Sequence, residues 1–506
     1  MPIFKGGSKT DVANYRPISL LATFSKIYEK LMHRRIVNFL ESNSSLFDMQ
    51  YGFRNSRSCE HALLKAQSLI LESLSKKEVS LLLLIDFSKA FDMVEHSILL
   101  KKLEHYGIRG TALELLKSYL SNREQFVTVS GKDSTKKPLK YGVPQGSILG
   151  PLLFIIYIND LPQISKFAKF IMYADDANII ITGKSVNEIN EKFNKLSEAL
   201  LSWVDTNGLK LNLKKTNYMI FSRQQKIAIP QGLFIGNTRI ERKSEARFLG
   251  VIMDEKLTFT RHIHALKSKM SRYVGVMYRL KGLIPVGVML QIYHSLVQSH
   301  INYCSLVWGF STKSNIESLF AGQKKGIRAV MPGFINFFFK DGITPAHTKP
   351  GFTKYNILSV HGIIVKNALI FMHKVKYLPS ILPPSIKDTI DPNSPLSYAS
   401  PSHETCRTWL ESFNDNYHRK SVFFKGPLIA TDKNIVGLSL RKGTTSTVLS
   451  TNAYKAKVKH YLLEQQGGGN SEEWEAGNFL LYGISGLRRS ERLNSEAQGV
   501  LPGDSC

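Results

Sequence analysis

Cysteine is scarce in this sequence of 506 residues, which contains only four. Cys59, Cys304, Cys406 and Cys506 lie far apart, and none of them forms a CxxC pair. Their spacing therefore indicates neither a zinc knuckle nor a disulfide framework. We expect no zinc partner, and the low cysteine content fits a reducing intracellular compartment.

Long apolar runs are also missing. The purely apolar stretch at residues 81–85 is much too short to cross a bilayer. The chain starts MPIFK, without the apolar stretch of a secretory signal peptide. We therefore expect a protein of the nucleus and cytoplasm that is not secreted and has no membrane partner.

Acidic side chains are few in relation to basic ones. The 67 Lys and Arg residues exceed the 40 Asp and Glu residues by 27, and most of this excess lies in residues 1–340. Such a surplus favours a polyanionic partner, because basic side chains displace counterions from a phosphate backbone. A solubilising surface and an anionic membrane surface are the alternatives to a nucleic acid.

Hydrophobic periodicity predicts an α+β domain, because apparent helices and strands alternate along the chain. The expected helices cover residues 24–41, 61–74, 98–106, 112–120, 148–159 and 186–207. The expected strands cover residues 81–85, 125–129, 167–173, 178–182 and 218–221. A basic helical region, 262–278, leads into a further helical stretch at 291–308, and the pattern weakens from about residue 341.

Three carboxylates are candidates for a metal site. Asp86 ends the predicted buried strand, and Asp175 and Asp176 form the tip of the predicted hairpin. Nucleotidyl transfer uses two Mg²⁺ ions held by such carboxylates, and like charges placed together need a cation to offset their repulsion. An Asp-Asp pair alone is more often a polar turn. The strand ending at Asp86 and the basic chain around it favour the metal site.

Seven short motifs follow one another between residues 14 and 251. They are NYRPISL (14–20), QYGFR (50–54), LIDFSKAFD (84–92), GVPQGSILGP (142–151), YADD (173–176), GLKLN with KKT (208–212 and 214–216), and FLGV (248–251). In this order they resemble the fingers motifs, motifs A to D and the primer-grip motif of reverse transcriptases from non-LTR (LINE-type) retrotransposons, such as the jockey and CR1 groups.

The resemblance implies roles for individual residues. Asp86, Asp175 and Asp176, with the backbone of Phe87, would hold two Mg²⁺ ions, with Mn²⁺ as an alternative. Lys215 would protonate the pyrophosphate leaving group, with Lys214 as the second candidate. The implied nucleotide-binding residues are Arg54, Phe91, Gln145 and Gly146, joined by Arg16 as a second phosphate ligand; the implied primer grip is Phe248, Leu249 and Gly250.

Two of these roles compete with structural alternatives. Phe91 occupies the position of a steric gate that excludes a ribose 2′-hydroxyl, but a core aromatic at the start of a helix is a common alternative. Arg54 and Arg16 would grip phosphates, which suit a guanidinium fork, whereas a solvated surface arginine is the simpler explanation. Gln145 lies in a Gly/Pro-rich loop where the backbone can closely approach a base and sugar.

The resemblance also implies a right-hand polymerase fold with fingers, a palm built of an antiparallel sheet and helices, and a helical thumb. The expected divisions are fingers and palm at 1–253, a helical thumb-like region at 254–340, a C-terminal region of unknown role at 341–466, and a disordered tail at 467–506. Because the chain begins almost at the first motif, we expect it to lack the endonuclease that usually precedes this polymerase.

The implied activity is RNA-directed DNA polymerisation, in which deoxynucleoside triphosphates extend a DNA primer on an RNA template. The alternative is a truncated or co-opted protein that binds nucleic acid without turnover. A group II intron maturase shares the motif order, but the residues that make up LIDFSKAFD and the primer-grip motif disfavour this alternative.

Overall fold

The computed structural model describes residues 1–129, 131–224, 232–331, 348–389, 421–422, 429–430 and 451–468. The chain forms two compact units, Met1–Ser244 and Glu245–Cys506. The first unit contains the motifs up to KKT, and the second begins just ahead of the primer-grip motif.

A six-stranded sheet organises the first unit. Its strand order is β11-β12-β10-β3-β9-β8. All neighbouring pairs are antiparallel except β10 and β12, which are parallel. The strands are β3 (Val79–Ile85), β8 (Lys169–Tyr173), β9 (Asp176–Gly183), β10 (Asn217–Phe221), β11 (Leu233–Ile235) and β12 (Thr238–Arg242).

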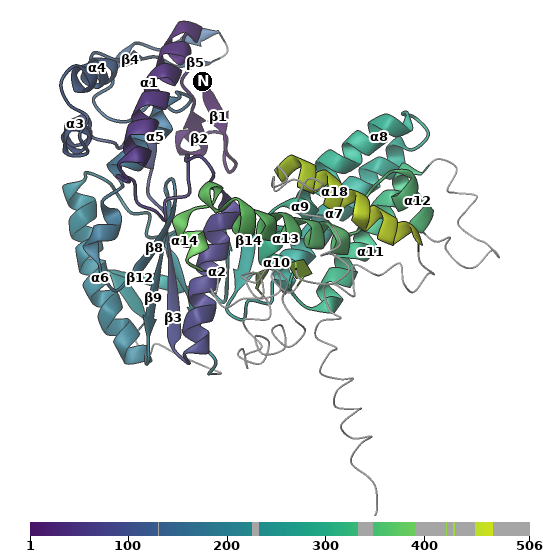
Figure 1. Ribbon diagram of the computed structural model, residues 1–506. Coiled ribbons are helices and arrows are strands. Elements are labelled where there is room, and N and C mark those ends of the chain that lie inside the picture. Colours follow the sequence, from purple (N-terminus) through teal and green to yellow (C-terminus); the bar gives the residue numbers. More distant parts are fainter. Residues whose placement is uncertain are drawn as a thin grey trace, which may run out of the picture. The chain divides into compact units, whose positions relative to one another are not determined.

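The central strand β3 is apolar on both faces because helices cover both sides of the sheet. Helix α6 (Val186–Thr206) and helix α2 (Cys59–Ser75) lie on opposite sides of it (Figure 1). Leu81 and Leu83 point into the core on the α6 side, whereas the equally buried Leu82 lies outside that cluster. This alternation is the two-residue period of a strand.

Local capping fixes where the two covering helices begin. The hydroxyl of Ser58 accepts a hydrogen bond from the His61 amide, and the hydroxyl of Ser185 accepts one from the Glu188 amide. Both satisfy amide groups that the first turn of a helix leaves unpaired.

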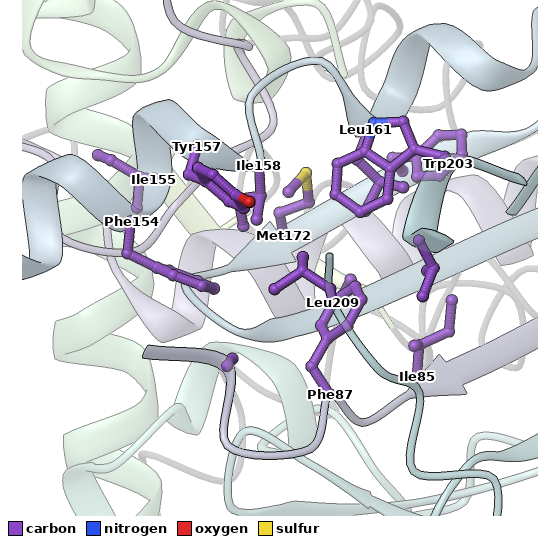
Figure 2. Close-up of a cluster of buried hydrophobic side chains, with 14 of the residues drawn as sticks. Ile85, Phe87, Phe154, Ile155, Tyr157, Ile158, Leu161, Met172, Trp203 and Leu209 are labelled. Carbon is purple, nitrogen blue, oxygen red and sulfur yellow. The ribbon is translucent and has the colours of Figure 1, made fainter. Parts of the chain in front are cut away.

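Helix α5 (Leu149–Tyr157) is the most deeply buried helix of the first unit, with all but one of its residues in the core. Figure 2 shows its Phe154, Ile155 and Tyr157 in the same cluster as Met172 of β8 and Trp203 of α6. Phe87, immediately after the Asp86 position, contributes its ring to this cluster. The segment that carries Asp86 is therefore anchored by apolar packing.

The remaining elements of the first unit surround this core. They are β1 (Pro2–Phe4), β2 (Tyr15–Pro17), α1 (Thr23–Ser42), α3 (His96–His105), α4 (Thr111–Leu120), the strand pairs β4 (Glu124–Gln125) with β7 (Lys137–Pro138) and β5 (Thr128–Val129) with β6 (Lys132–Asp133), and the 3₁₀ turns η1 (Val12–Asn14), η2 (Ala90–Asp92) and η3 (Leu161–Ile164). The strand predicted at 125–129 is wrong in its continuity, because β4 and β5 pair with different partners.

The second unit begins with a hairpin and continues as helices. Its elements are β13 (Glu245–Phe248), β14 (Val251–Asp254), α7 (Thr260–Leu280), α8 (Val286–Tyr293), the π-helix η4 (His294–Gln298), α9 (Ser299–Asn302), α10 (Ser305–Trp308), α11 (Lys313–Val330), α12 (Lys349–Lys354), α13 (Val360–Tyr377), η5 (Pro379–Ile381), α14 (Pro384–Lys387) and α18 (Thr451–Gly468). Helix α7 packs on α11, α11 on α13, and α13 on α18.

Two details of the second unit differ from the predicted pattern. The helix predicted over 291–308 is interrupted, because Cys304 adopts a left-handed conformation with φ of 49° between α9 and α10. The region beyond residue 341 is more regular than its sequence suggested, since α13 is an 18-residue helix that is buried along most of its length. Residues 469–506, most of the predicted tail, lie outside the described residues.

The structure confirms the predicted α+β fold, with a sheet and packed helices in the first unit and helices following the hairpin in the second. Within the described parts of the chain, no helix has the combination of length and apolar character that a membrane span requires.

Candidate active site

The three predicted carboxylates lie at the same end of adjacent strands. Asp86 directly follows β3, whose last residue, Ile85, pairs with Ala177 of β9. Asp176 pairs with Tyr173 across the β8–β9 hairpin, and Asp175 occupies the turn between them. The sheet register thus brings together residues that are about ninety positions apart in the sequence.

The electrostatics of this cluster are unfavourable in the absence of a cation. Burial raises the pKa of Asp176 from 3.8 to about 6, and the negative charges of Asp175 and Asp86 add to the shift. Burial likewise raises the pKa of Asp175, with Asp86 adding to the shift, while Arg16 and Lys5 oppose it. A divalent cation would offset this repulsion.

The donor chemistry of the cluster suits a hard cation, because carboxylate oxygens are the ligands that Mg²⁺ prefers. Among the residues that the structure describes, no group of three or more His, Cys, Asp or Glu side chains converges as a metal-ion site. The charges of the three aspartates therefore influence one another, but their side chains do not converge on one point as metal ligands would.

The ring of Phe87 packs in the core, which leaves its backbone as the part that could serve this cluster. The ring is buried, with its centroid 6.5 Å from that of Trp203. Phe87 faces Leu211 in an antiparallel bridge, in which the flanking hydrogen bonds come from Ser88 and Asp86. In such a pair the amide and carbonyl of the central residue point away from the partner strand.

Lys215 lies beside Asp86. Its Nζ is 3.7 Å from Asp86 Oδ2, and its side chain is 72% exposed. The loop before Lys215 is fixed to the strand end, since the Asn212 amide donates to the Asp86 carbonyl at 2.8 Å. The Lys215 amide donates in turn to the Asn212 carbonyl at 3.0 Å. The structure thus places an exposed cation next to a predicted metal ligand.

The GVPQGSILGP loop is held against the segment that follows Asp86. The amide of Val143 donates to the Phe91 carbonyl at 2.9 Å, and the side-chain amide of Gln145 donates to Asp92 Oδ1 at 2.8 Å. Gly142 has φ of +86°, and a Cβ there would lie 2.9 Å from the Asp92 carbonyl oxygen. Glycine is required at this position by both its conformation and the close approach.

Phe91 packs in the core and stays partly exposed. Its ring stacks on Phe154 at a centroid distance of 4.4 Å and meets the edge of Phe53 at 6.4 Å. Gly146, which lies in the same loop as Gln145, is exposed with φ of +114°. The carbonyl of its predecessor Gln145 accepts a hydrogen bond from the Ser19 amide at 2.7 Å, so the first fingers motif contacts this loop.

Arg54 has a structural environment that its predicted phosphate-binding role did not anticipate. Its Nε and one terminal nitrogen donate to both oxygens of Glu41 at 2.8 and 2.6 Å, and the other terminal nitrogen donates to the Phe47 carbonyl at 2.6 Å. The side chain is 4% exposed. In this structure the guanidinium is committed to a carboxylate and a carbonyl, whereas Arg16 is exposed.

Gln50 is a residue of the site to which the sequence assigned no role. It is 1% exposed, and its side-chain oxygen accepts hydrogen bonds from the amides of Gly52 and Ala174 at 2.9 and 3.1 Å. Ala174 is the residue directly before Asp175. The available signal was the QYGFR motif itself, whose glycine suggests a close backbone approach.

Glu29 is a second such residue. It is fully buried, and its Oε2 accepts from the amides of Ile148 and Leu149 at 2.6 and 3.2 Å. A side chain of α1 therefore satisfies the first amides of α5, directly after the GVPQGS loop. A glutamate among the apolar positions of a helix was the only signal in the sequence.

The primer-grip residues form the turn of the β13–β14 hairpin in the second unit. Phe248 is buried and pairs with Val251. Leu249 and Gly250, with φ of 43° and 82°, make the two-residue turn between the strands. The hydroxyl of Tyr303 donates to the Leu249 carbonyl at 2.8 Å, which fixes the tip of the turn.

A largely antiparallel sheet with a charge-coupled aspartate cluster at one end defines the palm of a template-directed polymerase. Residues 5–253 match the family model described as reverse transcriptase (RNA-dependent DNA polymerase). These residues are a reverse transcriptase domain of the non-LTR retrotransposon type, as the seven motifs predicted.

Two similar curated proteins come from mobile elements of Drosophila melanogaster. The chain is 29% identical over 332 residues to the probable RNA-directed DNA polymerase from transposon X-element, and 28% identical over 336 residues to the RNA-directed DNA polymerase from mobile element jockey. Each match covers 64% of this chain and 36% of the relative, so the chain spans little more than a third of their length.

Among solved structures, the chain is similar to apo telomerase from Candida tropicalis, with 14% identity and a TM-score of 0.36. That match covers 72% of this chain and 59% of the telomerase chain.

Proposed function

We propose that this chain is an RNA-directed DNA polymerase that extends a DNA primer on an RNA template with deoxynucleoside triphosphates. The observation that carries the proposal is the cluster of Asp86, Asp175 and Asp176 at one end of the palm sheet, with Lys215 beside it. The relatives named as RNA-directed DNA polymerases support the template and product assignments.

Asp86 and Asp175 would hold two Mg²⁺ ions, with Asp176 beside them and the Phe87 backbone completing the site; Mn²⁺ is the alternative ion. Bound there, Mg²⁺ would supply Lewis acidity toward the primer 3′-hydroxyl and neutralise charge on the triphosphate. The raised pKa values of Asp175 and Asp176 support this assignment, because their causes include mutual repulsion that a cation relieves.

Lys215 would donate a proton to the leaving pyrophosphate. Its exposed side chain can move, and its position beside Asp86 keeps the ammonium group near the developing negative charge. A general acid contributes most when it is within hydrogen-bond reach of the leaving oxygen, which a flexible lysine can achieve.

The incoming nucleotide would lie against the GVPQGS loop and Phe91. Gln145 and Gly146 would contact its sugar and base through a loop whose glycines allow close approach. Phe91, fixed by stacking on Phe154, would exclude a ribose 2′-hydroxyl. Arg54 enters this proposal only if its ion pair with Glu41 opens, and Arg16 is the exposed phosphate ligand.

The nucleic-acid partners would be held by charge and by the hairpin turn. The net charge of +27 supports binding of an RNA template and a DNA primer through their phosphates. Phe248, Leu249 and Gly250 would position the primer end, because a two-residue turn presents backbone groups at a fixed point.

Primer extension on poly(rA)–oligo(dT) with Mg²⁺ tests the proposal. Incorporation of dTMP by the wild-type chain, and its loss in the Asp175→Asn/Asp176→Asn double variant, is the expected result. Equal incorporation by both proteins would contradict it. RNA binding without incorporation by either protein would instead identify a nucleic-acid-binding protein without turnover.

A further inference from the structure

We propose that Gln50 is a positioning residue whose side-chain oxygen holds the catalytic hairpin turn at Ala174, and thereby sets the direction of the Asp175 and Asp176 carboxylates. This inference rests on the proposed function, because it assigns Gln50 a part in aligning the predicted metal ligands. It gives the QYGFR motif a role distinct from nucleotide binding.

The side-chain oxygen of Gln50 joins a residue that is near it in the sequence to one that is far away. Gln50 Oε1 accepts from the amide of Gly52 at 2.9 Å and from the amide of Ala174, 124 positions along the chain, at 3.1 Å. Both amides therefore meet at one buried oxygen, in a side chain that is 1% exposed. Such a shared acceptor fixes the two backbone segments relative to each other.

The main chain around Gln50 strengthens this attachment. The amide of Tyr51 donates to the Met172 carbonyl at 2.8 Å, and the Met172 amide donates to the Met49 carbonyl at 2.9 Å. Gln50 and Met172 form a parallel bridge. The fingers motif thus pairs with β8 through one backbone bridge at Met172. From there the side chain of Gln50 extends to the turn at Ala174.

The turn needs an external partner because its conformation is unusual. Ala174 has φ of +54°, in the left-handed region that a residue with a Cβ adopts only when its surroundings fix it. Ala174 is also buried, so its amide needs an acceptor within the protein. The hydrogen bond to the Gln50 oxygen both pairs the buried Ala174 amide and holds Ala174 in its left-handed conformation.

Gly52 completes the arrangement by allowing close approach. A Cβ at Gly52 would lie 2.4 Å from the Ala174 amide nitrogen and 3.0 Å from the Tyr173 carbonyl carbon. Any side chain at this position would push the turn away from the fingers motif. At this contact the motif therefore offers the residues directly before Asp175 a backbone without a side chain at Gly52, and the Gln50 oxygen as an acceptor.

The oxygen is the functional half of the Gln50 amide. Its Nε2 is buried and has no hydrogen-bond partner among the described residues, so the nitrogen contributes no contact to the turn. A glutamate at this position would keep the acceptor, whereas a methionine of similar length would remove it. This difference allows the acceptor to be tested apart from the volume of the side chain.

The test compares Gln50→Met, Gln50→Glu and the control Asn159→Leu. Asn159 is also a buried amide, and it anchors the neighbouring segment through the Phe47 amide and the Ser45 carbonyl. The readouts are the unfolding temperature, kcat, the dNTP KM and the Mg²⁺ concentration that gives half-maximal primer extension.

Gln50→Met is expected to lower kcat by on the order of tenfold to a hundredfold, because small misplacements of reacting groups have effects of this size. It should also raise the half-maximal Mg²⁺ concentration while leaving the dNTP KM within about twofold, because misaligned metal ligands slow the chemical step without removing a contact to the bound nucleotide. Gln50→Glu should recover part of the loss. Asn159→Leu should lower the unfolding temperature without changing the Mg²⁺ requirement.

An unchanged Mg²⁺ requirement in Gln50→Met, or an equal change in Asn159→Leu, would overturn the proposal. If Gln50→Met does not fold, the shorter Gln50→Asn is measured in the same way. If the wild-type chain does not polymerise, the proposed function fails while Gln50 remains testable. The rise in unfolding temperature that MnCl₂ causes in the wild-type chain should then be smaller in Gln50→Met, and an equal rise would refute the role.

Discussion

The Nζ atom of Lys215 lies 3.7 Å from Oδ2 of Asp86, although the two residues are 129 positions apart in the sequence. The loop that carries Lys215 is tied to the Asp86 backbone through the Asn212 amide, so the backbone holds the base of this lysine near the strand end. Because the side chain is largely exposed, we expect this ion pair to contribute little to stability.

Lys215→Ala should therefore slow catalysis without unfolding the protein. We expect the rate of single-nucleotide incorporation to fall by on the order of a hundredfold or more, the usual contribution of a general acid. The unfolding temperature should stay within about 2 °C, as expected for a surface substitution. Lys214→Ala is the matched control, and a larger loss in that variant would transfer the role to Lys214.

Phe91→Ala should admit ribonucleotides. The ring is held by stacking on Phe154, so its removal opens space beside the Gln145 loop. Discrimination is measured as the ratio of kcat/KM for dTTP and UTP, and we expect it to fall by at least about tenfold, or roughly 1.4 kcal/mol. Phe53→Ala, which removes the ring that meets Phe91 edge-on, serves as the control for lost packing.

An unchanged ratio in Phe91→Ala would make Phe91 a core aromatic alone. The unfolding temperature will fall in either case, because a partly buried ring is lost. Only the nucleotide ratio separates the two roles.

Glu29→Leu should destabilise the first unit and weaken nucleotide binding. The substitution leaves the Ile148 and Leu149 amides without their acceptor at the buried start of α5. Loss of a buried hydrogen-bond acceptor costs about 1–3 kcal/mol in the free energy of unfolding. Denaturant titration measures this loss, and the dNTP KM should rise because the GVPQGS loop ends at these amides.

Glu29→Gln keeps one acceptor oxygen and should lose less stability than Glu29→Leu. A Glu29→Gln variant as unstable as Glu29→Leu would show that the charge, and not the acceptor, caps the helix.

The metal-free protein should lose stability as the pH rises from about 4 to about 6. The pKa of Asp176 is raised to about 6 in the folded chain from an ordinary value of 3.8, so between these values the folded state binds more protons than the unfolded state. Asp176→Asn removes this contribution and should raise the unfolding temperature in EDTA at pH 7, but not near pH 4.

Addition of Mg²⁺ at pH 7 should raise the unfolding temperature of the wild-type chain more than that of Asp176→Asn. A variant that unfolds at or below the wild-type temperature in EDTA at pH 7 would show that burial and the neighbouring carboxylates do not destabilise the charged form of Asp176.

The sequence predicted the parts of the fold and site that depend on local pattern. The apolar run before Asp86 predicted β3, and the two apolar strands flanking the Asp-Asp pair predicted the β8–β9 hairpin. The motif order predicted the reverse transcriptase domain itself. These features are readable because short segments encode them through burial and turn chemistry.

The missed features depend on contacts between distant segments. The acceptors in Gln50 and Glu29 meet amides 124 and 119 positions away, and no local pattern reveals such partners. Arg54 shows a second kind of limit, since the same guanidinium fork binds a phosphate or a carboxylate equally well. In the structure the fork is occupied by Glu41, a residue of α1 with no special signature.

The most direct test of the aspartate cluster is single-turnover incorporation by Asp86→Asn on an RNA template with a DNA primer, measured beside binding of the same duplex. Asparagine keeps the size of the side chain and removes the charge that couples Asp86 to Asp175, Asp176 and Lys215. The proposed function predicts that incorporation is lost by at least about a thousandfold, of the order that transition-state charge stabilisation supplies, while duplex binding stays within a few fold. Incorporation at the wild-type rate would contradict it.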